Sequence, residues 1–314
     1  MLALLSGALY GALSGRAVQV DWTDAVFAPE GDASTRHVNL FPLLFESATL
    51  GVWEPGQASE DVEPAAWRGK LAMTAANLSR EIEPNRYRDF GVFHRSSVDV
   101  SRTDHAAKLL VFWAWRERIL PMRRRLRRQM PELAGLSDTE ILRRLAGRHL
   151  QPSEPIREAV ERAWTSMPEG PAVGLHIRHS DMKAPVEPLV RRAEAALARL
   201  GATHVVLATD NAEVEQRVRA RLGENRVYAT DKAFATPGVP LHYDTACRDR
   251  IARASEALTD MLLLSRCDHM VYASRSSFGY LAHVLADARQ TVDDCDRLNP
   301  KVQGKRLVQK YWYR

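Results

Sequence analysis

Three loops in the second half of the chain carry the charged and hydroxyl side chains best suited to bind an anion. They are residues 178–181, 210–211 and 274–277, and each follows a short apolar segment. An arginine fork binds a diphosphate through paired charge-assisted hydrogen bonds, and a serine at a helix start leaves backbone N–H groups that attract negative charge. These residue types predict a site for a phosphorylated ligand such as a nucleotide diphosphate.

Individual positions in and near these loops have a functional and a structural interpretation. Arg178 directly follows a predicted strand, where a diphosphate-binding fork is favoured over an ordinary surface arginine. His176 stands two residues before Arg178, so both side chains lie on the same face of the strand. His176 is therefore either a ligand contact or a core histidine with its hydrogen bonds satisfied inside the protein. Asp260 stands among apolar residues, so it needs a partner in the protein or a ligand's N–H or hydroxyl groups. Ser276 and Ser277 can cap a helix and bind an anion at the same time.

Several other chemistries lack their sequence signals. No GxGxxG follows a strand, and neither GxxxxGK[ST] nor GxSxG occurs, so dinucleotide-binding, P-loop and nucleophile-elbow sites are poorly supported. Residues 293–296 contain a DxD that could bind a metal, but the segment is polar and turn-like. The histidines show no ligand spacing, and the cysteines at positions 247, 267 and 295 form no CxxC. We therefore expect no metal site and a reducing compartment.

Strands that alternate with helices must position these loops. Strands are predicted at 171–177, 203–209, 226–229 and 269–273, and helices at 188–200, 212–222, 250–266 and 277–286. This alternation is typical of βαβ units, which build a parallel sheet with helices on both faces. Ligands bind at the carboxyl ends of such strands, where the three loops fall. The second half is therefore predicted to be a Rossmann-like α/β domain.

The first half is less regular. Residues 1–14 predict a core helix that ends at Gly15, residues 16–22 a strand, and residues 23–38 a polar turn region. Helices are expected at 64–78, at 104–119, at 137–149 behind a capping box, and at 153–167. The basic run 122–129 is interpreted as a solvated helix face or, alternatively, as a patch for an acidic partner. A domain boundary is expected near residues 151–153 or, alternatively, near 169–170, and the first gives domains at 1–150 and 151–314.

Composition limits the class of protein. With 314 residues, 45% hydrophobic and 26% charged, the chain has the make-up of a two-domain globular protein and not of a disordered or coiled-coil one. The net charge of +5 is spread too evenly to favour nucleic-acid binding. The apolar start is too short to span a bilayer and has no signal-peptide features. We therefore expect no transmembrane segment and a cytoplasmic protein, with association at the inner membrane face as the alternative.

The three loops lie in motifs that resemble those of the α1,6-fucosyltransferase superfamily, which includes rhizobial nodulation fucosyltransferases and animal N-glycan core α1,6-fucosyltransferases. The motifs are GLHIRHSD (174–181), VVLATDN (205–211) and EALTDMLLLSRCDHMVYASRSSFGYLA (256–282). Upstream, SGRAVQVDW (14–22) and HLQPSEPIREAVERAW (149–164) are similar to two further family segments. The likeness is strongest from about residue 147 to 285.

The resemblance implies a GT-B-like glycosyltransferase with two Rossmann-like domains, the N-terminal one on the acceptor side and the C-terminal one for the nucleotide sugar. It implies inverting transfer of L-fucose from GDP-β-L-fucose to a glycan or glycolipid hydroxyl, without a metal or other cofactor. Carried over by position, the donor-binding residues are His176 for the nucleotide, Arg178 for the diphosphate, Asp210 for the pocket's shape, Asp260 for guanine or ribose, and Ser276 with Ser277 for phosphate.

Two departures from the family pattern affect catalysis. The first strand and glycine-rich loop of the family have no counterpart in this sequence. The motif reads R-H-S-D, so His179 stands where a second arginine is expected. Asp181 and Glu187 are the candidates for the general base, and neither matches the family pattern.

Three alternative functions follow from these observations. A transferase that uses a different nucleotide sugar would share the scaffold, and a non-catalytic GDP- or glycan-binding protein would fit the missing loop. Nucleic-acid binding through the basic residues 123–128 would show affinity that falls steeply with salt.

Overall fold

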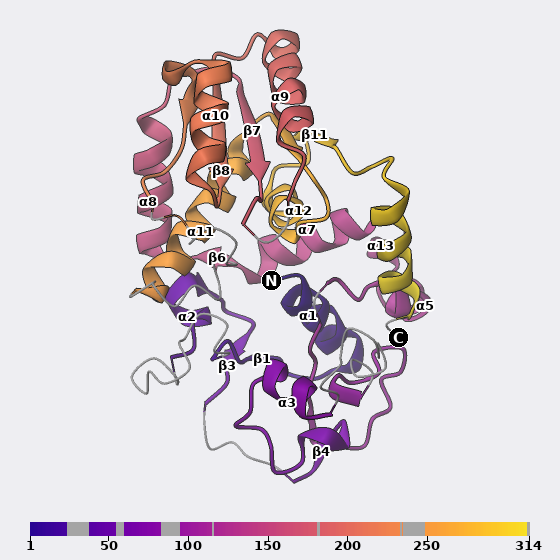
Figure 1. Cartoon of the computed structure of the whole chain (residues 1–314). Helices are drawn as coiled ribbons and strands as arrows, with labels where there is room; N and C mark the ends of the chain where they lie inside the picture. Colours follow the sequence, from indigo (N-terminus) through magenta and orange to yellow (C-terminus); the bar gives the residue numbers. More distant parts are fainter. Residues whose placement is uncertain are drawn as a thin grey trace. The chain divides into compact units, whose positions relative to one another are not determined.

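A five-stranded sheet forms the core of residues 152–303, which we name unit 2 (Figure 1). Every neighbouring pair of its strands is parallel, so all five carboxyl ends lie at one edge. The strand order is β11 (Thr291–Asp294), β10 (His269–Tyr272), β7 (Ala172–Ile177), β8 (His204–Thr209) and β9 (Val227–Tyr228). The three loops predicted to bind an anion follow β10, β7 and β8, which are adjacent in this order.

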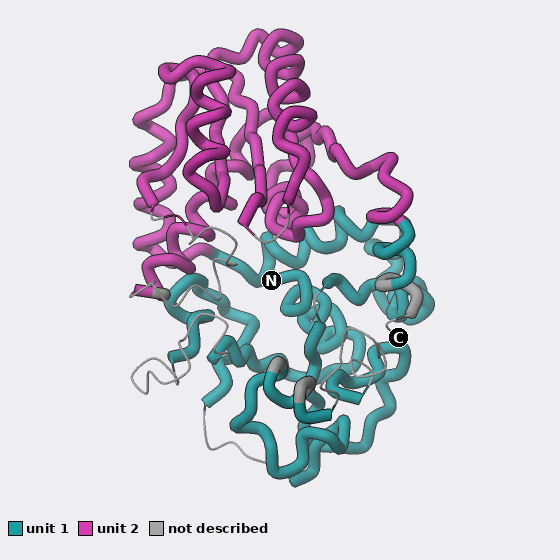
Figure 2. The backbone as a smooth tube through the Cα atoms, in the orientation of Figure 1, with its two compact units in different colours: residues 1–151, 304–314 teal, residues 152–303 magenta. Residues whose placement is uncertain are grey.

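The remaining chain, residues 1–151 with 304–314, forms unit 1 (Figure 2). The division falls within β6 (Gln151–Pro152). The computed structural model describes residues 1–23, 38–54, 60–82, 95–114, 116–180, 183–232, 234 and 249–312. Among these residues, no helix combines the length and the apolar character needed to cross a membrane.

Helices cover both faces of the unit 2 sheet. On one face, Leu175 and Ile177 of β7 share a buried cluster with Leu189 of α9 (Val186–Leu200) and Val214 of α10 (Ala212–Leu222). Successive strand residues point to opposite faces. Gly174 accordingly faces α11 (Arg250–Arg266), where an added Cβ would lie 3.1 Å from Leu264. The strands β7, β8 and β10 are therefore buried on both sides, as their apolar sequences predict.

Two further helices complete unit 2. The N-terminal α8 (Glu154–Thr165) packs on α11. The other, α12 (Ser277–Leu285), follows β10 and packs on it through Gly279, where an added Cβ would lie 2.8 Å from the Cβ of Tyr272. A short 3₁₀ turn, η4 (Glu224–Arg226), precedes β9.

Unit 1 contains short strands in pairs and several helices. Here β1 (Gln19–Val20) pairs with β3 (Gly51–Val52), and β4 (Val62–Glu63) with β5 (Leu109–Leu110). The remaining elements are α1 (Leu2–Ser14), α2 (Phe41–Leu44), β2 (Phe45–Glu46), η2 (Ala65–Trp67), α3 (Ala75–Ile82), η3 (Leu120–Met122), α5 (Arg123–Gln129), α6 (Pro131–Ala134), α7 (Asp138–His149) and α13 (Pro300–Trp312), whose last turns belong to this unit.

Several predictions for unit 1 are confirmed. The helix α1 ends at Gly15, which takes the left-handed conformation with φ 68°. Its side chains are mostly buried, and it packs against α5 and α7. The capping box at the start of α7 is present, because Ser137 and Glu140 bond to each other's backbone N–H groups.

Other predictions for the first half are wrong or too long. The described part of 104–119 contains no helix, because Leu109 and Leu110 form β5 against β4. The predicted helix 64–78 is instead the single turn η2, followed by a bend and by α3, which begins at Ala75. The strand expected at 16–22 is limited to β1. Most of the turn region 23–38 lies outside the described residues.

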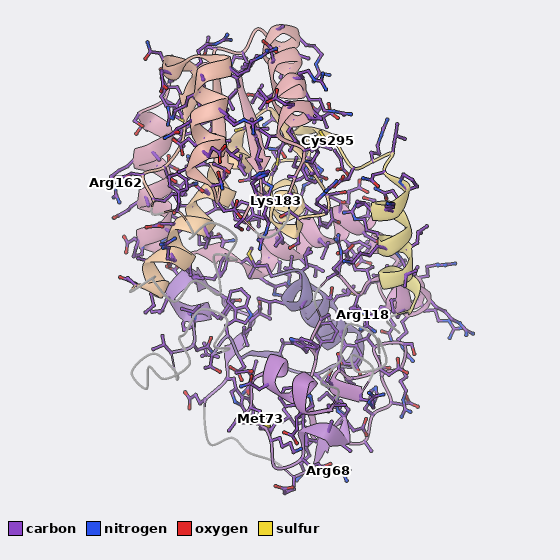
Figure 3. All side chains as sticks on the ribbon, viewed as in Figure 1. Arg68, Met73, Arg118, Arg162, Lys183 and Cys295 are labelled. Atoms are coloured by element: carbon purple, nitrogen blue, oxygen red, sulfur yellow. The ribbon has the colours of Figure 1, made fainter. Side chains whose placement is uncertain are left out.

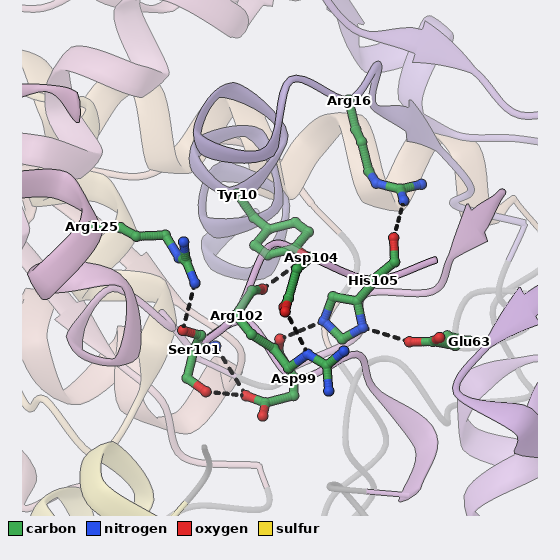
Figure 4. A network of polar contacts seen from close by, with 9 residues as sticks. All are labelled: Tyr10, Arg16, Glu63, Asp99, Ser101, Arg102, Asp104, His105 and Arg125. Atoms are coloured by element: carbon green, nitrogen blue, oxygen red, sulfur yellow. Dashed lines mark hydrogen bonds and ion pairs between the residues drawn. The ribbon is translucent and has the colours of Figure 1, made fainter. Parts of the chain in front are cut away.

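A buried histidine ties three segments of unit 1 together (Figure 4). The Nδ1 atom of His105 lies 2.5 Å from a carboxylate oxygen of Glu63 in β4, and its Nε2 atom lies 2.9 Å from the backbone carbonyl of Asp99. A carbonyl only accepts hydrogen bonds, so Nε2 carries a proton. Tyr10 of α1 packs edge-on against the His105 ring and donates to the carbonyl of Arg102, 3.1 Å away. The network anchors α1 to the β4–β5 pair.

Candidate functional site

Asp210 joins the loop after β8 to the loop after β7. Its Oδ1 accepts hydrogen bonds from the backbone N–H groups of His179 and Ser180, at 2.7 and 3.2 Å. Its Oδ2 accepts one from the Ser180 hydroxyl, at 2.5 Å. The carboxylate therefore fixes the backbone that immediately follows Arg178, and it reaches this position because β7 and β8 are neighbours in the sheet.

The loop after β7 is further closed by its own residues. The carbonyl of Arg178 accepts a bond from the backbone N–H of Ala184 at 3.1 Å. The ammonium of Lys183, labelled in Figure 3, donates to the carbonyl of His179 at 2.9 Å. The half-buried side chain of Arg178 thus extends from a backbone that is held at both ends.

The loop after β10 is held by the segment that the sequence analysis considered as a DxD metal motif. Asp294 accepts a hydrogen bond from the backbone N–H of Ser274 at 2.9 Å. Asp296, whose side chain is 1% exposed, accepts two from the Arg275 guanidinium, at 2.9 and 2.6 Å, and one from the Arg275 backbone N–H at 3.0 Å. These bonds to Asp296 raise the pKa of Arg275. The segment begins as edge strand β11 and not as the turn-like region expected from its polarity.

The serines after β10 take different positions. Ser276 is buried at the N-cap of α12, and its hydroxyl oxygen accepts from the backbone N–H of Phe278 at 3.4 Å. Ser277 is the first residue of the helix and is exposed. The cap predicted from the sequence is present, and the remaining N–H groups of the first turn give this end of α12 its partial positive charge.

Some of the buried polar side-chain atoms that have no hydrogen-bond partner among the described residues lie at the carboxyl edge of the sheet. They are His176 Nδ1, His179 Nδ1, Thr209 Oγ1 and Ser274 Oγ, which come from the ends of β7, β8 and β10 or from the residues directly after them. An unsatisfied buried polar group costs about 1–3 kcal/mol. Four such groups at the ends of three adjacent strands are what a binding site for a polar ligand would contain, because the ligand would supply their partners.

His176 is a neutral, buried member of this group. Its ring stacks on Phe278 of α12, with 4.8 Å between ring centroids and 16° between ring planes. Burial lowers the pKa of His176 to about 3, and the positive charges of Arg178 and Lys232 act in the same direction, while Asp210 opposes them. At neutral pH the imidazole therefore offers one donor and one acceptor and no charge.

The neutral state of His176 predicts a pH-dependent loss of stability. Between a folded pKa of about 3 and the ordinary 6.5, the unfolded chain binds a proton that the folded protein does not, so the free energy of unfolding falls as the pH drops below 6.5. From pH 7 to pH 5 we expect the wild type to lose about 2 kcal/mol more than His176→Gln. Urea denaturation of both proteins at the two pH values measures this. Equal losses would contradict the assignment.

Asp260 lies in the middle of α11 and is buried. Its Oδ1 accepts a hydrogen bond from the hydroxyl of Thr230 at 2.6 Å, and its Oδ2 forms an ion pair with the ammonium of Lys232. The partner that a buried aspartate requires is therefore a lysine, which the sequence analysis did not single out. Burial also raises the pKa of Glu256, one turn earlier on α11, and the negative charge of Asp260 adds to this.

The two candidates for the general base are not brought together. Asp181 lies outside the described residues. Glu187 is exposed in the first turn of α9 and pairs with Arg217 of α10 at 2.7 Å. Within the described ranges, no group of three or more histidine, cysteine, aspartate or glutamate side chains is arranged to hold a metal ion.

Comparison with known proteins identifies relatives of the chain. The family model of nodulation protein Z (NodZ) matches residues 133–302, which is more than half of the chain. A search of curated protein sequences gives no match.

Several solved structures have a similar fold. NodZ alpha-1,6-fucosyltransferase soaked with GDP-fucose aligns with a TM-score of 0.59 and 21% identity, over 95% of this chain and 90% of that one. The fucosyltransferase NodZ from Bradyrhizobium gives 0.55 and 20%, over 90% and 87%. A variant of Arabidopsis thaliana FUT1 in complex with GDP gives 0.51 and 12%, over 93% and 66%. At these identities the likeness establishes the fold.

Proposed function

The chain belongs to the NodZ family, and from this premise we propose that it transfers L-fucose from GDP-β-L-fucose to a hydroxyl of a glycan or glycoconjugate. The proposal includes inversion at the anomeric carbon, independence from metal ions and a GT-B-like division of labour, with unit 2 binding the donor and unit 1 the acceptor. The observation that carries it is the group of buried polar atoms at the carboxyl edge of the sheet, near Arg178, that find no hydrogen-bond partner in the described part of the chain. A NodZ structure soaked with GDP-fucose supports the choice of donor.

The positive charges at this edge suit the leaving group. Departure of the sugar leaves negative charge on the diphosphate, and preorganised donors stabilise it most. We assign Arg178 to the diphosphate as a bidentate fork, and Ser276 and Ser277 to a phosphate oxygen at the start of α12. An arginine and a helix N-terminus together would supply the charge that a divalent metal supplies in other transferases.

The other predicted donor residues receive supporting roles. Asp260 contacts the guanine base or the ribose, and the neutral His176 contacts the nucleotide. Asp210 shapes the pocket through its bonds to the backbone of His179 and Ser180 and does not need to touch the donor. The general base is assigned to Asp181, which follows Ser180 in the sequence, because Glu187 is occupied by Arg217.

The proposal predicts selective binding of guanine nucleotides. Calorimetric titration with GDP, GDP-fucose, UDP and CMP, each with and without EDTA, should give binding of the first two alone and affinities that EDTA leaves unchanged. A preference for UDP, or binding lost in EDTA, would overturn the proposal.

A second assay separates the remaining alternatives. GDP release from GDP-fucose and from GDP-mannose, measured with a panel of glycan acceptors, should be faster with GDP-fucose. Faster release from GDP-mannose would indicate a different donor. GDP binding without turnover of either sugar nucleotide would indicate a non-catalytic binding protein.

A further inference from the structure

Lys232 is a buried cation at the same edge of the sheet as Arg178. It follows β9, the neighbour of β8, and because the strands are parallel this fourth loop lies beside the other three. Its side chain is 9% exposed, and that of its partner Asp260 is 8% exposed. The charge of Lys232 contributes to the lowered pKa of His176, which places the ammonium within electrostatic reach of the end of β7.

A buried ion pair of this kind is weak evidence for a stabilising role. Removing two charges from water costs about as much as their attraction returns, and apolar residues of similar volume often replace such a pair without loss. A pair retained at the end of a strand, where parallel sheets bind ligands, has a second explanation in recognition.

Counted over the described residues, the Lys232–Asp260 pair keeps unused hydrogen-bonding capacity. An ammonium has three N–H donors, and Asp260 is the one acceptor of Lys232 among the described residues. A carboxylate has about four lone-pair sites, and Asp260 uses one for Lys232 and one for Thr230. The pair therefore presents donors beside acceptors in a buried setting.

We propose that Lys232 determines the base specificity of the donor site by donating a hydrogen bond to O6 of guanine. Guanine carries the acceptor O6 next to the donors N1–H and N2–H₂, which is the complement of an ammonium beside a carboxylate. Lysine is a common partner of this oxygen. Adenine carries an amino group where guanine has O6, so the ammonium would face a donor. This inference rests on the proposed function, in which Asp260 already faces the nucleotide.

The test compares ligands that differ at single positions of the base. GDP, 6-thio-GDP and IDP are titrated calorimetrically into the wild-type protein and into Lys232→Met. Sulfur at position 6 is a weak acceptor, so the wild type should bind GDP about 10-fold more tightly than 6-thio-GDP. In Lys232→Met this preference should vanish, while the preference for GDP over IDP, which lacks the N2 amino group, should persist because Asp260 remains.

A purely structural role of Lys232 gives a different result. It would weaken the binding of all three ligands by the same factor and leave the preference for GDP over 6-thio-GDP unchanged in the variant, which would overturn the inference. Lys301→Met, on the exposed side of α13, is the matched control and should leave all three affinities unchanged.

Two further outcomes keep the inference and the proposed function distinguishable. If Lys232→Met unfolds, Lys232→Gln keeps an N–H donor without the charge and should retain part of the preference for GDP over 6-thio-GDP. The comparison of GDP with 6-thio-GDP in the wild type needs no variant. Equal wild-type affinity for GDP and 6-thio-GDP would refute the inference and leave the proposed function standing. A folded wild type that binds no GDP would refute both.

Discussion

Arg178→Ala is expected to lower the turnover of GDP-fucose roughly 100- to 1,000-fold, because the proposed function assigns Arg178 to stabilising the charge on the departing diphosphate. Arg178 stands directly after β7, and the bonds of Asp210 to His179 and Ser180 hold the backbone that carries it. The backbone that carries the guanidinium is therefore held in place before the donor binds. Release of GDP from GDP-fucose measures turnover, and calorimetry with GDP measures the accompanying loss of affinity.

Two variants control this experiment. Arg178→Lys keeps the charge but loses the fork, so its turnover should lie between those of the wild type and Arg178→Ala. Arg191→Ala removes an exposed arginine from α9 and should leave turnover unchanged. Near-normal turnover in Arg178→Ala, with an unchanged melting temperature, would refute the role of Arg178 in the proposed function.

Asp296→Asn should lower the free energy of unfolding by about 3 kcal/mol. The substitution removes the charge of an almost fully buried carboxylate that holds the Arg275 guanidinium and the Arg275 backbone N–H. The expected cost is at the low end of the range for breaking a buried ion pair, because the side chain of Arg275 is 28% exposed and water can solvate its charge. Urea denaturation measures the loss. GDP affinity should fall as well, because the loop that leads to Ser276 loses its support.

Asp293→Asn makes the same chemical change three positions earlier. Asp293 pairs with Arg192, and both side chains are more than a third exposed, so the expected cost is below about 1 kcal/mol. Similar losses in the two variants would show that burial at Asp296 does not decide the effect.

The architecture of unit 2 could be predicted from the sequence because its elements are set by local pattern. The strands β7 and β8 are continuous apolar segments, and α10 and α11 have the bounds that helical periodicity gives. The strand β11 was missed for the opposite reason. Its pattern is exposed and half-buried, and two of its four residues are aspartates, so nothing local distinguishes it from a turn.

Unit 1 contains strand pairings that a local sequence pattern cannot predict. Leu109 and Leu110 belong to an apolar run that fits a helix, but their backbone pairs with Val62 and Glu63, far earlier in the chain. A pairing between segments so distant in sequence leaves no periodic signal in either of them. The predicted helix at 64–78 is likewise replaced by η2 and α3.

The positions of the candidate residues could be predicted where side chains follow strands, and were missed where side chains pair across the fold. The rule for carboxyl ends of parallel strands placed Arg178, Asp210 and Ser276 at one edge of the sheet, where the structure has them. The need of Asp260 for a partner followed from its apolar neighbours, but the choice of Lys232 and Thr230 depends on how α11 packs on the sheet. The role of Asp296 was hidden in a segment whose spacing suggested a metal.

The position of β11 has a consequence for how the protein is made. Chains grow from the N-terminus, and domains form as their residues become available. The loop after β10 needs Asp294 for Ser274 and Asp296 for Arg275, and both aspartates are synthesised after α12. A nascent chain that stops after α12 contains β7, β8 and β10 but lacks the aspartates that hold this loop. The loop after β10, at the carboxyl edge of the sheet, is therefore among the last parts of unit 2 to mature during translation.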